Sequence, residues 1–424
     1  MTLMTDSRMI TRESKRFFLT VLTILTASGC ANGENNGTAP SALIHAVNID
    51  PLTHLISGIG NTVSFSATPV DASNKTLTAD IEWAVLDSTI VSIDSNGTAK
   101  GLKVGTTIVI ASAGSKQVSV RIEVWDPPSV NKYSVGQTYQ GRKGYAEYIP
   151  GDLPLILSAG HGGNLCPNEI PDRTYGTIGR CSSTGSDMNT LPLTTTIRSI
   201  FLELTGHAPH IVLLRLARPK LDANRAIVEA AQGSSFAENA WSEYHGFIDA
   251  AKDTISKEFG FGLYLDMHGH GHDVPRIELG YLLTKTDLQT SSLDLPYMVN
   301  KSSVKALSGV SIASNPATTT FTDIIRGPSS LGTLLEARGV RAVPSSPDPG
   351  PTGNEAFFSG GYSTRRHGSR DGGVIDGVQF EHHYPGLRDT SSHRLSYANK
   401  LVEVLVVFLE THYGWSSSTY FNEN

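Results

Sequence analysis

The chain has 424 residues, of which 39% are hydrophobic and 17% charged, so it holds enough apolar material for two or three folded units. Its 34 Lys and Arg against 40 Asp and Glu give a net charge of −6 without basic runs, which argues against a nucleic-acid partner. The composition also excludes a coiled coil, a collagen-like chain, a wholly disordered chain and a multi-span membrane protein.

Residues 1–29 have the pattern of an export signal. Basic residues precede the apolar stretch Phe17–Ala27, which is too short to span a bilayer. The following Ala27-Ser28-Gly29-Cys30 resembles a bacterial lipoprotein lipobox, and this resemblance implies cleavage before Cys30 and lipidation of its thiol. An ordinary signal peptide with an incidental Cys is the alternative. We expect an exported chain in the cell envelope, anchored through Cys30 to the periplasmic or surface face of a bacterial membrane, with residues 30–44 as a polar tether.

Two further cysteines, Cys166 and Cys181, make an even number in an oxidising compartment. The loop between them is rich in Pro and Gly, without a helical period. It also lacks the His or Cys partners at short spacing that a zinc site needs. The sequence predicts a disulfide between them, with two free thiols as the alternative.

Residues 45–126 read as a small all-β module. Short runs of strand type recur at regular spacing, separated by turn signals such as Asp94-Ser95-Asn96-Gly97. The run of Trp83, Ser88–Ala99, Gly101 and Gly105-Thr106 resembles a bacterial Ig-like domain of group 2. The resemblance implies a sandwich that acts as a spacer or adhesive module. Residues 127–140, which begin with two prolines, read as a linker.

Residues 141–416 alternate strand and helix patterns, and residues 417–424 are a tail. Alternation of this kind predicts an α/β domain with a mostly parallel or mixed sheet, in which functional residues gather at the carboxyl ends of strands. The expected strands are Leu153–Ser158, Ile211–Leu216, Phe261–Met267, Ile277–Leu283 and Val378–Phe380. The expected helices are about 193–204, Phe236–Phe259 and Ser392–Tyr413, the last with Leu395 inward.

Three of these strand ends carry unusual residues: His161 between glycines, the His-rich run Asp266–His272, and Glu381-His382-His383. Imidazole is a common zinc ligand, carboxylates complete many catalytic sites, and glycines let a metal and substrate approach the backbone closely. We therefore expect a divalent metal, most simply zinc, at this edge of the sheet.

Several blocks, in order along residues 143–414, resemble the N-formylglutamate amidohydrolase family. The resemblance implies a phosphorylase/hydrolase-like α/β fold similar to zinc carboxypeptidases. It also implies zinc-dependent hydrolysis of an amide bond in a small carboxylate-bearing substrate. The blocks are Ala146–Leu155, Ser158–Gly163, Arg218–Arg225, Trp241 with Tyr244-His245, and Leu265–His268.

By this resemblance His161 and His268 match the family's metal ligands. Zinc carboxypeptidases have a Glu three residues after the first His, but Asn164 stands there in this chain. We expect Asp187 to supply the third ligand instead, because it precedes the next helix and its loop can bulge outward. Glu169 is the competitor, since it is nearer in sequence.

The remaining roles follow the same resemblance. Asn224-Arg225 match the pair that grips a substrate carboxylate, for which a guanidinium fork is suited. Glu381 stands where the general base is expected, and Asp266 can orient a ligand imidazole. Further histidines are assigned to the substrate pocket or to the surroundings of the ligands: His270, His272, His382 and His383.

The sequence thus supports two functions. The first is an exported zinc amidohydrolase that acts on an N-acyl amino acid or short peptide through metal-activated water. The second is a non-catalytic surface binding or adhesion protein built on a hydrolase-like domain, favoured by the Ig-like module and by Asn164. The oligomeric state stays open.

Overall fold

A computed structural model of the chain describes residues 43–127, 129, 132–176, 181, 187–314 and 319–416. The chain divides into two units, residues 1–43 and 44–424. The predicted export signal, Cys30 and the C-terminal tail lie outside the described residues. Within the described part of the chain, no helix has both the length and the apolar character that crossing a bilayer requires.

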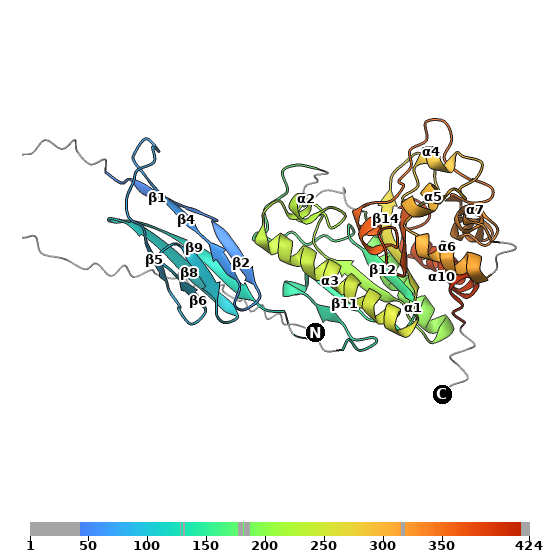
Figure 1. The fold of residues 1–424 in the computed structure, drawn as a ribbon, viewed down its shortest axis with the longest axis horizontal. Coiled ribbons are helices and arrows are strands. Elements are labelled where there is room, and N and C mark those ends of the chain that lie inside the picture. The colour runs from blue at the N-terminus through green and yellow to red at the C-terminus, as the bar shows by residue number, and fades with distance from the viewer. Residues whose placement is uncertain are drawn as a thin grey trace, which may run out of the picture. The chain divides into compact units, whose positions relative to one another are not determined.

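The N-terminal part of the second unit is all β, as predicted (Figure 1). Its strands are β1 (Ala46–Asp50), β2 (Thr53–Ser57), β3 (Thr62–Ser64), β4 (Ser66–Val70), β5 (Glu82–Val85), β6 (Val91–Ile93), β7 (Thr98–Gly101), β8 (Gly105–Ala113) and β9 (Lys116–Trp125). They form sheets in the orders β2-β9-β8-β5, β3-β7-β6 and β1-β4. Along β8 buried residues alternate with less buried ones, as in a strand with one face on a core.

The predicted turn at Asp94–Gly97 is present, and two of its residues, Asp94 and Gly97, explain why it forms. The Asp94 carboxylate accepts hydrogen bonds from the backbone N–H groups of Asn96 and Thr98, both at 2.9 Å. Gly97 has φ 80°, and a Cβ there would lie 2.5 Å from the Phe65 carbonyl oxygen. Only glycine combines easy access to a positive φ with the absence of a Cβ, so this position requires it.

The C-terminal part is an α/β domain around one mixed sheet. Its strands are β10 (Tyr139–Gln140), β11 (Ala146–Ile149), β12 (Leu155–Ala159), β13 (His210–Leu214), β14 (Gly262–His270), β15 (Ile277–Gly280), β16 (Ala342–Val343) and β17 (Ile375–His383). Their order is β10-β11-β13-β12-β14-β17-β15-β16. The central strands β13, β12, β14 and β17 are parallel, while β11 pairs antiparallel with β10 and β13, and β15 pairs antiparallel with β17 but parallel with β16.

Helices cover both faces of this sheet (Figure 1). They are α1 (Thr190–Thr205), α2 (Ile227–Ala231), α3 (Ser235–Glu258), α4 (Lys285–Leu288), α5 (Pro296–Lys301), α6 (Lys305–Ser314), α7 (Phe321–Arg326), α8 (Leu331–Glu336), α9 (Tyr362–His367) and α10 (Ser391–Tyr413), with a 3₁₀ turn at Arg142–Gly144. Leu155 and Leu157 pack in the core under α1 and α10, whereas Ile156 packs in the core under α3. This explains the continuous apolar run of β12, because a strand covered on both faces has no polar side.

Two sequence expectations about strand ends need correction. His268 and Glu381 do not follow their strands but lie inside β14 and β17, which run on to His270 and His383. The two strands pair in register over nine residues, from Gly262 opposite Ile375 to His270 opposite His383. This continuous ladder supplies hydrogen bonds that local sequence does not reveal, so the strands extend into the polar residues.

One further expectation fails in the helices. Leu395 of α10 is 53% exposed rather than inward, because the first turns of α10 project beyond the core that its later residues join.

Candidate metal centre

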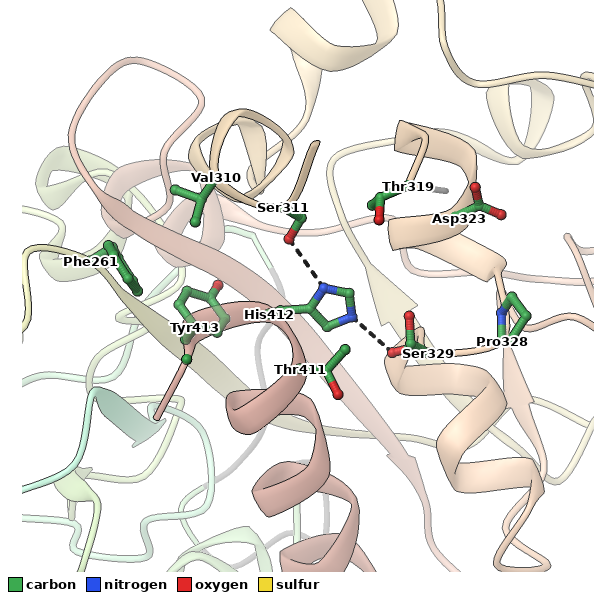
Figure 2. A pocket seen from close by; sticks show the side chains of 11 residues that line it. Phe261, Val310, Ser311, Thr319, Asp323, Pro328, Ser329, Thr411, His412 and Tyr413 are labelled. Carbon is green, nitrogen blue, oxygen red and sulfur yellow. Dashed lines mark hydrogen bonds between the residues drawn. The ribbon is translucent and has the colours of Figure 1, made fainter. Parts of the chain in front are cut away.

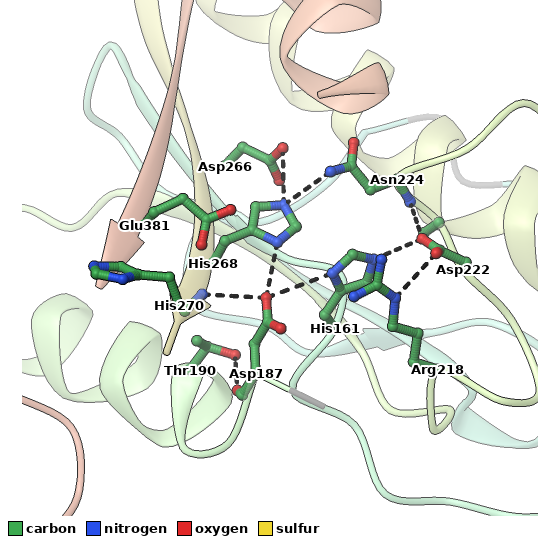
Figure 3. A network of polar contacts seen from close by, with 12 residues as sticks. His161, Asp187, Thr190, Arg218, Asp222, Asn224, Asp266, His268, His270 and Glu381 are labelled. Carbon is green, nitrogen blue, oxygen red and sulfur yellow. Dashed lines mark hydrogen bonds and ion pairs between the residues drawn. The ribbon is translucent and has the colours of Figure 1, made fainter. Parts of the chain in front are cut away.

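Three side chains of different elements meet at the carboxyl edge of the parallel strands (Figure 3). His161 follows β12 by two residues, His268 is on β14, and Asp187 lies just before α1. One ligand atom from each lies within 4.8 Å of the others, and all three side chains are buried. The Asp187 Oδ2 atom is 2.9 Å from His268 Nδ1 and 3.4 Å from His161 Nδ1.

Each imidazole in this cluster turns its other nitrogen to a second buried carboxylate. His161 Nε2 is 2.6 Å from Asp222 Oδ1, and His268 Nε2 is 3.1 Å from Asp266 Oδ2. Asp222 in turn forms an ion pair with Arg218, whose Nε lies 3.0 Å from Asp222 Oδ2. A carboxylate on the far nitrogen fixes the orientation of each ring, so that its Nδ1 faces Asp187.

The charges around the cluster favour a cation at its centre. Burial alone would raise the pKa of Asp187, but hydrogen bonds from His161 and His268 outweigh it and hold that pKa well below its usual value. For His268, burial opposes protonation, but the nearby carboxylates of Asp266 and Asp187 raise its pKa well above the ordinary range. Positive charge is therefore stabilised at this point.

Glu381 is the fourth acidic group of the site. It pairs in register with His268 across the β14–β17 ladder, and its side chain is buried with one oxygen accepting from Gln379 Nε2. Burial raises its pKa to about 7. A carboxylate in such surroundings exchanges protons readily near neutral pH, as a general base must.

The structure separates the two candidates for the third ligand. Asp187 lies in the cluster, whereas the Glu169 carboxylate is held elsewhere by Arg142 and Lys143 and by the Tyr145 hydroxyl at 2.7 Å. Burial would raise the pKa of Glu169, but these partners lower it to about 2. Asn164 is exposed. The alternative assignment of Glu169 is therefore not supported, because its charge is already neutralised by two cations.

The two residues predicted to bind substrate differ in position. Asn224 is buried, with Nδ2 3.4 Å from His268 Nε2 and Oδ1 accepting from the Ser363 N–H at 2.8 Å. Arg225 is partly exposed and pairs through Nε with Glu229 Oε1 at 3.1 Å, while its Nη1 donates to the Asn224 carbonyl. Asn224 thus borders the cluster, whereas Arg225, the next residue in the chain, lies further from it.

The remaining predicted histidines surround the cluster without joining it. His382 is buried, and its Nδ1 lies 2.7 Å from the carbonyl oxygen of His268 on the neighbouring strand. His270 Nε2 donates to the Arg276 carbonyl at 2.7 Å.

Three contributors to the site were not assigned a role from sequence: Asp222, Gly269 and Arg388. Asp222 lies within the block Arg218–Arg225 that carries the family resemblance, and its place in that block was the sequence signal that could have pointed to it. The Gly269 N–H donates to Asp187 Oδ2 at 3.1 Å, and a Cβ on Gly269 would lie 2.3 Å from Arg388 Cζ. Arg388 donates to the carbonyls of His382 and Met188, which ties β17 to the segment that carries Asp187. No local sequence pattern predicts this long-range contact.

A cavity of about 590 Å³ lies apart from these residues, between α6, α7 and the end of α10 (Figure 2). His412 lines it, with Nδ1 3.1 Å from Ser311 Oγ and Nε2 3.0 Å from the Ser329 carbonyl oxygen. None of the candidate metal or catalytic residues lines this cavity. His412 with both nitrogens paired serves to join three segments of the fold.

The predicted disulfide between Cys166 and Cys181 is present, which confirms the prediction. Residues 44–124 match the family described as bacterial Ig-like domain (group 2), which confirms that module. Together they indicate an extracellular or cell-surface protein. This match covers 81 residues of the all-β part and does not extend into the α/β domain.

Comparison with known proteins gives further partial matches. Ice-binding protein 1 of Shewanella frigidimarina is 27% identical over 104 residues, which are 24% of this chain and 12% of that protein. Domains 4 and 5 of the S-layer protein SbsC are 20% identical with a TM-score of 0.18, over 19% of this chain and 52% of theirs. The chain therefore spans about an eighth of the curated relative and about half of that S-layer fragment.

Two solved structures overlap a longer part of the chain. A gene product of Agrobacterium tumefaciens is 14% identical with a TM-score of 0.37, over 64% of this chain and 96% of that one. An N-formylglutamate amidohydrolase from Ralstonia eutropha JMP134 is 12% identical with a TM-score of 0.37, over 63% of this chain and 97% of that one. Likeness at this level does not establish a shared function.

Proposed function

We propose that the α/β domain is a zinc-dependent hydrolase that cleaves an amide bond in a small carboxylate-bearing substrate, either an N-acyl amino acid or a short peptide. The observation that carries the proposal is the convergence of His161, Asp187 and His268 with Glu381 beside them. Two imidazoles and one carboxylate fit zinc in a catalytic site, which has three protein ligands. Other divalent ions with a preference for nitrogen ligands fit the same set.

The chain's own residues would share the chemistry as follows. Asp222 and Asp266 hold the two ligand imidazoles in orientation, since each faces the nitrogen away from Asp187. When bound, zinc supplies a Lewis acid that polarises the amide carbonyl and lowers the pKa of water. Glu381 takes the proton of the attacking water and returns it to the leaving nitrogen.

Binding of the substrate carboxylate is assigned to Asn224 and Arg225. Asn224 is fixed by Ser363 and borders His268, so a ligand on it lies next to the cluster. Arg225 presents a partly exposed guanidinium whose partner Glu229 is also partly exposed, so a substrate carboxylate can take the place of Glu229.

The site of action is proposed to be the cell envelope, with the chain anchored to a bacterial membrane through a lipid on Cys30. The Ig-like domain and the disulfide support an extracellular or cell-surface place. The anchor itself rests on the sequence around Cys30.

The second candidate is a surface binding protein without catalysis. The Ig-like module favours it, because such a domain can act as a spacer or adhesive module without any catalytic residues. The absence of a carboxylate at position 164 no longer favours it, because Asp187 brings one to the two histidines.

A hydrolysis screen of the full chain distinguishes the two candidates. We expect turnover of N-acyl amino acids or short peptides with a free carboxylate, slower turnover of the matching carboxamides, loss of activity on chelation and its return with zinc. Amine release from each substrate pair is the measurement. Zinc-loaded protein that turns over none of these substrates would favour the binding protein.

A further inference from the structure

A second group of side chains with metal-ligating atoms lies at and past the end of the strand that carries His268. His270 ends β14, His272 follows it, and Glu278 lies on β15. One ligand atom from each of the three lies within 4.8 Å of the others. None of these side chains is a member of the first cluster, so the two sets do not compete for ligands.

The imidazole of His270 is held in a metal-binding tautomer. His270 Nε2 donates its proton to the Arg276 carbonyl at 2.7 Å, which leaves the lone pair on Nδ1. A ring whose far N–H is bound to a backbone carbonyl is the usual arrangement of a metal-ligating histidine. Among the described residues, Nδ1 accepts a hydrogen bond from the neighbouring His272 N–H at 3.1 Å, a local bond between residues two apart. His272 turns its own Nδ1 to Glu278 Oε1 at 2.9 Å.

The charge of Glu278 supports a cation here. Its side chain is fully buried, and among the described residues its only ion-pair partner is His272. Its other oxygen accepts from the Phe358 N–H at 2.8 Å. Glu278 also stands opposite Glu381 in the β15–β17 ladder, so two buried carboxylates occupy neighbouring strands. Buried carboxylates need a paired cation or a metal, and no Lys or Arg of the described residues pairs with this one.

A further imidazole lies beside the group. The His383 ring centroid is 5.4 Å from that of His270, and among the described residues its buried Nδ1 has no hydrogen-bond partner. A buried ring nitrogen without a partner is costly, and coordination is one way to satisfy it.

We propose that His270, His272 and Glu278 form a second divalent metal site, with His383 as an additional imidazole next to it. The ligand set, rich in imidazole with one carboxylate, suits zinc or another nitrogen-preferring divalent ion. A metal here would fasten the segment after β14 to β15, and through Glu278 to Phe358, beside the strand that carries Glu381. The proposal does not depend on the proposed hydrolase activity.

Zinc binding to the full chain, measured by equilibrium dialysis and elemental analysis, tests the proposal. We expect two zinc ions per chain in the native protein and one in His272→Gln. The choice of His272 limits damage to the fold, because its side chain is 21% exposed. The matched control is His393→Gln, since His393 also pairs with one carboxylate, Asp389, at 2.7 Å but belongs to neither group. This control should keep two ions.

The results separate the two sites. His268→Ala should leave one ion, and the double variant with His272→Gln should leave none, whether or not the first site catalyses any reaction. As a second readout, Co²⁺ titrated into His268→Ala should give a visible ligand-field spectrum that disappears in the double variant. Equal zinc content in native protein and His272→Gln, or an unchanged Co²⁺ spectrum, overturns the second site.

Discussion

Replacing His268 by Ala should remove both the metal at the first centre and the hydrolytic activity. His268 supplies one of three converging ligand atoms, and two protein ligands rarely hold zinc tightly. Loss of an outer-shell partner typically costs about 10- to 100-fold in metal affinity, so loss of a direct ligand should cost at least about 100-fold. Zinc affinity by competition with a chromogenic chelator, and turnover at saturating zinc, are the two measurements.

His393→Ala is the control for the histidine substitution, because its partly exposed ring lies outside the cluster. It should keep native zinc affinity and native turnover. Turnover at the native rate in His268→Ala, with the zinc affinity unchanged, would remove His268 from the centre.

Glu381→Gln should keep the metal and lose turnover. The amide has nearly the same shape as the carboxylate, and Gln379 can still bond its oxygen, so the fold and the two imidazoles should stay in place. A Gln cannot accept the proton of the attacking water, and loss of a general base costs about 10²- to 10⁴-fold in rate. The defect should lie in kcat, with KM changed little, because Glu381 is assigned to proton transfer and not to binding.

The comparison for this substitution is Glu203→Gln, an exposed carboxylate of α1. It should have native rates, which shows that the loss in Glu381→Gln is not a general effect of one negative charge. Native kcat in Glu381→Gln would withdraw the base assignment and leave the metal centre standing.

The places of the proposed ligands in the fold could be predicted from the sequence because they depend on local rules. His161 stands between glycines directly after a continuous apolar run, and such a run predicts a buried strand that feeds a functional edge. His268 was expected just after its strand and lies near the end of β14, and the parallel pairing of β12 and β14 brings it to the same edge of the sheet as His161. Asp187 was placed by its position before α1, and the fold brings it to both histidines.

Other parts of the site depend on contacts that local sequence does not encode. Arg388 reaches Met188 across 200 positions of chain, and Asp222 reaches His161 across 61. The length of β14 and β17 is set by their mutual ladder, so the boundaries predicted from each strand alone were too short. Several helices between β15 and β17, such as α4, α5 and α7, have only four to six residues, which is little more than one turn and too short for a helical period to be recognised.

The most direct test of the metal centre is the zinc affinity of Asp187→Asn beside Glu169→Gln, both made in the His272→Gln background so that the second group does not contribute. Asp187 contacts His161 and His268, whereas Glu169 is paired with Arg142 and Lys143. We expect Asp187→Asn to lose at least about 100-fold in zinc affinity, more than the loss typical of an outer-shell change, and Glu169→Gln to bind as its parent does. Parental affinity in Asp187→Asn, or a loss confined to Glu169→Gln, would contradict the centre of His161, Asp187 and His268.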